Sequence, residues 1–121
     1  MKVIGTVNQK IKDLLGINVS VDRIVMSEGL VKHLKKRHHL NMLPYMDKIS
    51  EILEEPDYVG INPNESDTSL EYVKVYADNV LVAVKLDIKE GQFFIATMHE
   101  LSEKKITRRL HSGRLKQLTK K

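Results

Sequence analysis

Apolar residues in the first half of the chain recur at helical spacing. Around residues 8–16 they stand three and four positions apart, which predicts a short helix with Asn8 as its N-cap and Gly16 just after its end. The same spacing predicts a second helix over residues 27–39 and a third between Pro44 and Pro56.

After residue 57 the pattern changes to alternation and to short β-prone runs bounded by turn residues. Four strands are predicted, at Tyr58–Ile61, Leu70–Tyr76, Val80–Ile88 and Gln92–His99. In the last of these, simple alternation places four side chains on one face: Phe93, Ile95, Thr97 and His99. Residues 102–118 are expected to form a weak basic helix interrupted by Gly113.

Helices followed by a meander of strands are typical of the α+β class. We expect N-terminal helices packed on a four-stranded, mainly antiparallel sheet. With 121 residues the chain is expected to be a single domain over residues 1–121, with its core at about 24–99 and a basic C-terminal extension at 103–121.

Composition narrows the range of possible chemistry. Hydrophobic residues make up 41% and charged residues 30%, as in a soluble globular protein, and there is neither a bilayer-length apolar run nor a signal-peptide pattern. We therefore expect no membrane association. The absence of cysteine excludes disulfides, thiolate zinc sites and cysteine nucleophiles, and it fits a cytoplasmic location.

Charge is distributed in blocks along the chain. The formal net charge is +4, with a pI near 9.3. Residues 30–40 and the segment from Lys104 onward are basic, and residues 47–71 between them are mostly acidic. Two basic blocks favour a polyanionic partner, although solvated helix surfaces give the same pattern.

The first basic block contains three of the five histidines. Imidazoles transfer protons near neutral pH, and lysine and arginine bind phosphate oxygens. On an ideal helix His33 and Arg37 lie one turn apart on the flank of the apolar face, and His38 lies close to that face. Three side chains are expected to point away from it: Lys32, Lys36 and His39. A basic amphipathic helix with solvated histidines remains the alternative.

Metal binding is not expected from this cluster. His33 and His38 are five positions apart, a spacing that turns the two rings away from one another, and no carboxylate lies at a helical ligand spacing from His33. We expect neither a metal nor another cofactor.

Two polar residues interrupt the apolar strands of the predicted sheet, namely Lys85 and Thr97. Each is compatible with the solvent face of a half-exposed sheet. Both also stand on strands predicted to be central, where a binding surface would lie.

The order of these motifs resembles the phage-associated branch of the barnase–EndoU–colicin–RelE-like (BECR) ribonucleases. The resemblance runs from about residue 24 to residue 99. It rests on H-x3-R-H in one helix, E-E-P-D at the end of the next, and V-x-V-K and F-F-I-A-T in the strands. Family members commonly carry an aromatic residue two positions after the strand threonine, whereas this chain has His99 there.

The resemblance implies a barnase/RelE-like fold and metal-independent RNA cleavage by attack of the 2′-hydroxyl on the adjacent phosphate. It implies His33 or His38 as acid–base, Arg37 and Lys85 on phosphate, and Thr97 positioning substrate. Nucleic-acid binding is expected from further residues of the helix, strand and tail: Lys32, Lys36, His99, Arg108 and Arg109.

Three functions remain open from the sequence. The first is a toxin-like endoribonuclease acting on RNA, with tRNA as one candidate substrate and an acidic inhibitor or immunity protein as an expected partner. The second is a nucleic-acid-binding module without catalysis, and the third is a phage structural or interaction domain.

Overall fold

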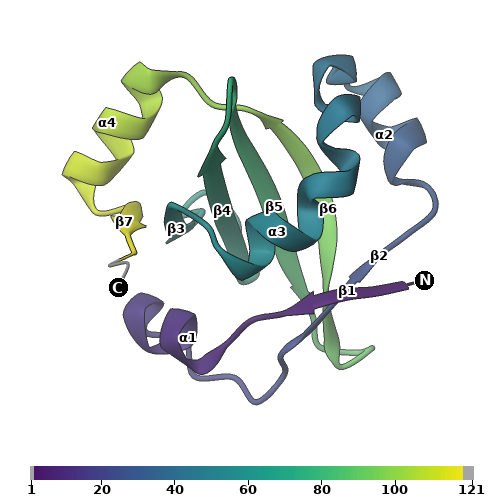
Figure 1. Ribbon diagram of the computed structural model, residues 1–121. Coiled ribbons are helices and arrows are strands. Elements are labelled where there is room, and N and C mark those ends of the chain that lie inside the picture. The colour runs from purple at the N-terminus through teal and green to yellow at the C-terminus, as the bar shows by residue number, and fades with distance from the viewer. Residues whose placement is uncertain (1, 119–121) are drawn as a thin grey trace.

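The computed structural model describes residues 2–118, and Figure 1 shows the arrangement of its elements. The strands are β1 (Lys2–Thr6), β2 (Arg23–Met26), β3 (Tyr58–Ile61), β4 (Ser69–Val75), β5 (Asn79–Asp87), β6 (Gln92–Glu100) and β7 (Leu115–Gln117). The helices are α1 (Gln9–Leu15), α2 (Leu30–Lys36), the 3-10 helix η1 (Leu40–Lys48), α3 (Ile49–Glu54) and α4 (Glu103–Ser112).

All strands join one seven-stranded sheet in the order β1-β2-β6-β5-β4-β3-β7. The α+β class is confirmed, but the four-stranded sheet was wrong, because the predicted meander β3–β6 is extended at both edges by short strands. Strand β2 pairs in parallel with β6, whereas the other neighbouring pairs are antiparallel. The sheet is therefore mixed.

The two faces of the sheet are covered differently. One face is buried beneath α1, η1 and α3, and Figure 1 shows α3 running across it. The opposite face carries a smaller apolar cluster beneath α4, made of Val73, Leu81, Leu101, Ile106 and Leu115. Because α4 packs at one side of this second face and α2 lies at the other end of the sheet, the strands between them are left uncovered (Figure 1).

Helix α1 forms as the sequence predicts. The Asn8 side chain accepts a hydrogen bond from the Ile11 backbone N–H at 2.9 Å, and Gly16 ends the helix with φ 69°. The helix expected between Pro44 and Pro56 is divided instead: Pro44 lies inside η1, and only α3 is α-helical. A proline has no N–H to donate, which disfavours α-helical hydrogen bonding around it.

The C-terminal segment is part of the sheet rather than a continuous helix. Ser102 caps α4 by accepting from the Lys105 N–H at 3.2 Å, as expected, and Gly113 ends it in the left-handed region. Beyond Gly113 the chain forms β7, which pairs with β3, so the predicted helix over 115–117 was wrong. Residues 119–121 of the predicted extension lie outside the described residues.

An irregularity in β6 determines which of its side chains face the uncovered strands. Ile95 is paired with Val84, but Thr97 is paired with Ala83, so Ala96 is an extra residue at a β-bulge. Phe93 and Ile95 are therefore buried in the main core, whereas Thr97 lies on the opposite face. The expectation that Phe93, Ile95, Thr97 and His99 share a face was wrong, because simple alternation does not foresee a bulge.

Candidate functional site

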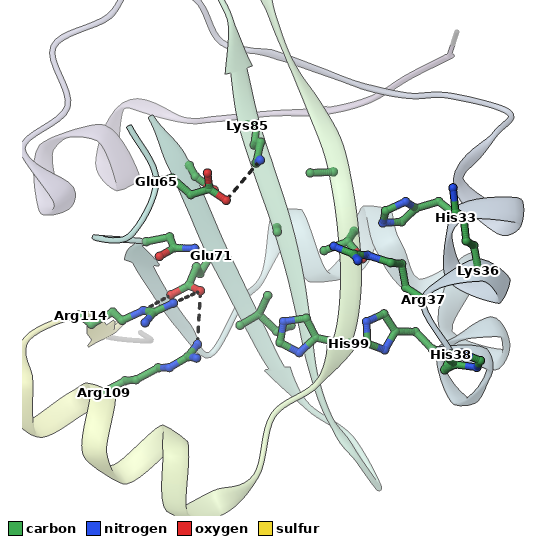
Figure 2. Close-up of a pocket in the computed structure, with 17 residues that line it drawn as sticks. His33, Lys36, Arg37, His38, Glu65, Glu71, Lys85, His99, Arg109 and Arg114 are labelled. Atoms are coloured by element: carbon green, nitrogen blue, oxygen red, sulfur yellow. Dashed lines mark hydrogen bonds and ion pairs between the residues drawn. The ribbon is translucent and has the colours of Figure 1, made fainter. Parts of the chain in front are cut away.

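A cleft of about 550 Å³ lies over the uncovered strands, between α2 on one side and α4 on the other. Figure 2 shows basic side chains reaching into this cleft from both sides. Its lining residues are His33, Lys36, Arg37, His38, His39, Asn62, Glu65, Ser69, Glu71, Leu81, Ala83, Lys85, Ala96, Thr97, His99, Arg109 and Arg114.

The wall formed by α2 presents His33 and Arg37. Burial of Leu30 and Leu34 against the core fixes the rotation of this helix, so the flank that carries His33 faces the strands. The helix ends at Lys36 with Arg37 as its C-cap, one turn after His33. Figure 2 shows both side chains on the side of α2 that faces the strands.

Helix α2 ends at Lys36, so the two histidines that follow it do not lie where a continuous helix would place them. His38 is exposed and has φ 60°, a left-handed conformation that costs energy in a residue with a Cβ, and it does not lie near the apolar face as expected. His39 and Lys36 were expected to point away, but both line the cleft, and His39 is half-buried. An ideal-helix projection fails here because the helix stops before them.

His39 contacts His99, the last cleft residue of β6. Their ring centroids are 5.7 Å apart, with the rings tilted by 36°. His99 Nδ1 lies 3.0 Å from the Glu100 carbonyl oxygen, which can only accept, so Nδ1 carries the proton and Nε2 of the neutral ring is left as the basic nitrogen. Burial lowers the pKa of His39, and so do the neighbouring groups His99, Arg37, His33 and His38.

The floor of the cleft is formed by one row of residues across three strands. Glu71 on β4 pairs with Ala83 on β5, which pairs with Thr97 on β6. The Thr97 hydroxyl oxygen is buried and makes no hydrogen bond with any described residue. Ala83 leaves open space between the two polar side chains because it has only a methyl group.

Lys85 lies in the neighbouring row and is held at the mouth of the cleft by an acid. Its Nζ is 3.3 Å from Glu65 Oε1, and both side chains are more than one-third exposed. Glu65 comes from the loop between β3 and β4. The cationic group predicted to contact phosphate is therefore paired with a carboxylate that an anion would have to displace.

The wall on the α4 side is an ion-pair cluster that the sequence analysis did not identify. Glu71 accepts from Arg114 Nε and Nη2, both at 2.8 Å, and from Arg109 Nη1 at 3.3 Å. The hydrogen bond to Glu71 raises the pKa of Arg114, whereas burial lowers the pKa of Arg109. One buried carboxylate thus holds two guanidinium groups at the edge of the cleft.

The cleft gathers most of the residues singled out from the sequence. All five residues assigned to catalysis line it: His33, Arg37, His38, Lys85 and Thr97. Of those assigned to nucleic-acid binding, Lys36, His99 and Arg109 line it too. Lys32 is exposed on α2 away from the lining, and Arg108 lies in a separate depression on α4 with Lys104 and His111.

The residues that were missed are Asn62, Glu65, Ser69, Glu71, His39 and Arg114. Glu71 had a detectable signal, since it stands between Leu70 and Tyr72 in a strand of otherwise apolar character. Arg114 had none, because its position depends on the chain leaving α4 as a strand.

Comparison with known families places the chain in one of them. Residues 1–108, nearly the whole chain, match the family described as phage-Barnase-EndoU-ColicinE5/D-RelE like nuclease3. The chain belongs to this family. Membership in this phage BECR nuclease family confirms the resemblance drawn from the sequence, and it makes nucleic acid the class of substrate. No curated protein and no solved structure matches the chain.

The described part of this BECR chain holds neither a candidate metal-binding cluster nor a helix that could span a membrane. Among residues 2–118 no three His, Cys, Asp or Glu side chains gather in a way that could hold a metal ion. None of the helices described is long and apolar enough to span a bilayer.

Proposed function

We propose that the chain is a metal-independent endoribonuclease that cleaves RNA by attack of the 2′-hydroxyl on the adjacent phosphate. The observation that carries the proposal is the convergence of the five predicted catalytic residues on one cleft of a chain in a nuclease family. They come from α2 and the turn that follows it, from β5 and from β6, and they are up to 64 positions apart, from His33 to Thr97.

The proposed reaction needs no nucleophile from the protein. The 2′-oxygen forms a bond to phosphorus while its proton passes to a base, and the bond from phosphorus to the 5′-oxygen breaks as that oxygen receives a proton from an acid. The products are a 2′,3′-cyclic phosphate and a free 5′-hydroxyl. Cations near the phosphorane stabilise the charge that develops on it.

The positions of the side chains support distinct roles. His33 is a proton-transfer group, since its ring faces the strands (Figure 2). Arg37 and Lys85 bind the non-bridging phosphate oxygens, Lys85 after its release from Glu65. Thr97 donates its unpaired hydroxyl to a substrate oxygen. His38 is the second proton-transfer group predicted from the sequence, and its exposure makes its contribution the weaker one.

Structured RNA such as tRNA is the proposed substrate. Basic residues outside the cleft lie on both flanking helices, Lys32 on α2 and Arg108 on α4, where they can contact phosphates of a larger RNA. An acidic inhibitor that covers the cleft is the proposed protein partner, because like an RNA it would complement both basic walls.

The test is incubation of purified protein with total tRNA in EDTA, with products resolved on denaturing gels. Cleavage is expected, with 2′,3′-cyclic phosphate ends, and His33→Ala is expected to lower its rate at least a hundredfold. Lys32→Ala is the matched control on the exposed side of the same helix, with a much smaller loss. Absence of cleavage at micromolar protein, with wild type and His33→Ala alike, would refute the proposal.

Binding experiments distinguish the proposed ribonuclease from the two alternatives, a nucleic-acid-binding module and a structural or interaction domain. Salt-sensitive RNA binding without cleavage, unchanged when all histidines are replaced, would indicate a nucleic-acid-binding module. Recovery of a protein partner but no nucleic acid would indicate a structural or interaction domain.

A further inference from the structure

The cluster formed by Glu71, Arg109 and Arg114 occupies the side of the cleft opposite His33 and Arg37 (Figure 2). Glu71 and Thr97 are separated by two strand spacings, which is about 10 Å. A phosphate bound beside Thr97 therefore leaves room for a second anionic group over β4.

The cluster carries an excess of positive charge. The two guanidinium groups are opposed by one carboxylate, whose side chain is 5% exposed, while those of Arg109 and Arg114 are 17% and 18% exposed. Glu71 accepts from only three of their N–H groups, and each guanidinium has five. Most of these donors are left for another acceptor, and their planar arrangement matches phosphate oxygens.

The backbone around the cluster is built to hold both arginines. Ser112 Oγ donates to the Arg109 carbonyl at 3.2 Å and accepts from the Arg114 N–H at 3.3 Å. On β3, Gly60 packs so closely that a Cβ there would lie 1.9 Å from the Arg114 carbonyl oxygen. The two guanidinium groups are thus fixed before any ligand binds, which lowers the entropic cost of binding.

We propose that Arg109 and Arg114 form a second phosphate subsite, for a phosphate that flanks the scissile one, and that Glu71 is a positioning residue for it. The proposal rests on the proposed function in that it takes the substrate to be a nucleic-acid strand. Its consequence is that the preferred substrate carries at least two phosphates, so a dinucleoside monophosphate fills only part of the cleft.

The experiment measures binding of 2′-O-methyl dinucleotides of mixed sequence, which lack the nucleophile and cannot be cleaved by this route. The probes have no terminal phosphate, a 5′-phosphate or a 3′-phosphate. Wild type is expected to bind one phosphorylated probe at least fivefold more tightly than the unphosphorylated one. Equal binding of all three probes, at low salt, would overturn the proposal.

Arg109→Gln is the main variant, because Arg114 still pairs with Glu71 and the fold is retained; a circular-dichroism melt verifies this. The terminal-phosphate gain is the ratio of the affinities for the preferred phosphorylated probe and the unphosphorylated probe. In Arg109→Gln the logarithm of this ratio is expected to fall to half of its wild-type value or less. Lys104→Gln is the matched control, since it removes one positive charge from α4 outside the cleft lining, and it should keep the full gain. An equal gain in Arg109→Gln and wild type would also overturn the proposal.

Two further variants separate the subsite from structural effects. Glu71→Gln is expected to reduce the terminal-phosphate gain while leaving affinity for the unphosphorylated probe within twofold, which loss of the fold would not do. Arg37→Gln should lower the affinity for all three probes by a similar factor and should therefore keep the terminal-phosphate gain. Because none of the probes is cut, a protein that binds them in this way but cleaves no RNA would refute the proposed function and support the subsite.

Discussion

His39 and His99 lie ring against ring, with their centroids 5.7 Å apart, although they come from opposite halves of the chain. Burial and nearby positive charge lower the pKa of His39. The folded protein therefore binds this proton less readily than the unfolded chain, whose histidine has a pKa of about 6.5. Stability from this group is present above that pH and is lost as the pH falls below it.

We predict that His39→Asn makes the stability less sensitive to acid. Urea unfolding at pH 7.5 and pH 5 should show a smaller loss in the free energy of unfolding for the variant than for wild type. His111→Asn, at an exposed position of α4, is the control and should behave as wild type. The same pH dependence in wild type and His39→Asn would contradict this account.

Replacement of Thr97 by valine is expected to separate stability from activity. The hydroxyl is buried without a hydrogen bond, so its removal at constant shape should leave stability unchanged or raise it by up to about 1 kcal/mol. If the hydroxyl donates to substrate, cleavage should fall about 10- to 100-fold, as expected for loss of a hydrogen bond to a charged group. Thermal melts and initial cleavage rates measure the two effects.

Tyr72→Phe is the matched control for Thr97→Val. The Tyr72 hydroxyl is likewise buried and without a hydrogen bond to any described residue, but the ring belongs to the main core on the other face of the sheet. Stability should again be unchanged or higher by up to about 1 kcal/mol, with full cleavage activity. A loss of activity in both variants would mean that repacking of the sheet, rather than a contact with substrate, causes the effect.

Glu65→Gln should strengthen nucleic-acid binding. The change frees Lys85 and removes a negative charge from the mouth of the cleft. Since an exposed ion pair is worth about 0.2–1 kcal/mol, a gain of about 1.5- to 5-fold in affinity at low salt is expected, shrinking as salt is added. Glu90→Gln, in the turn between β5 and β6, controls for net charge, and an equal gain there would argue against a specific role for Glu65.

Gly60→Ala should separate β7 from β3. A Cβ at this position would lie 1.9 Å from the Arg114 carbonyl oxygen, so the backbone must move, at an expected cost of about 2–4 kcal/mol in the free energy of unfolding. Gly29→Ala, where the nearest atom to a Cβ would be Ser27 Oγ at 3.5 Å, should cost less than about 1 kcal/mol. Chemical denaturation of both variants tests this, and similar losses would contradict it.

Local signals were sufficient for much of the fold. The cap at Asn8, the end of α1 at Gly16 and the strand Tyr58–Ile61 follow from side-chain hydrogen bonding, backbone freedom and alternation, which act within a few residues. The candidate residues of α2 and the turn after it were found because reactive side chains concentrate there. Lys85 and Thr97 were found because they interrupt apolar strands, and the resemblance to a nuclease family gave them roles.

What the sequence did not reveal depends on contacts between distant segments. Strand β7 exists because β3 offers an edge for it to pair with, and only that pairing places Arg114 beside Glu71. The places of His38 and His39 depend on where α2 ends, since the chain leaves this helix after Lys36 and begins η1 at Leu40.

The extra residue at Ala96 has a consequence for the evolution of this strand. A deletion of the single codon for Ala96 would restore regular pairing and leave Thr97 opposite Ala83, on the cleft face, because Ala96 is the residue without a partner. An alignment that matches β6 without a gap to a relative lacking the bulge would therefore pair cleft positions with core positions. A lineage that lost this one residue would keep both its sheet and its cleft floor.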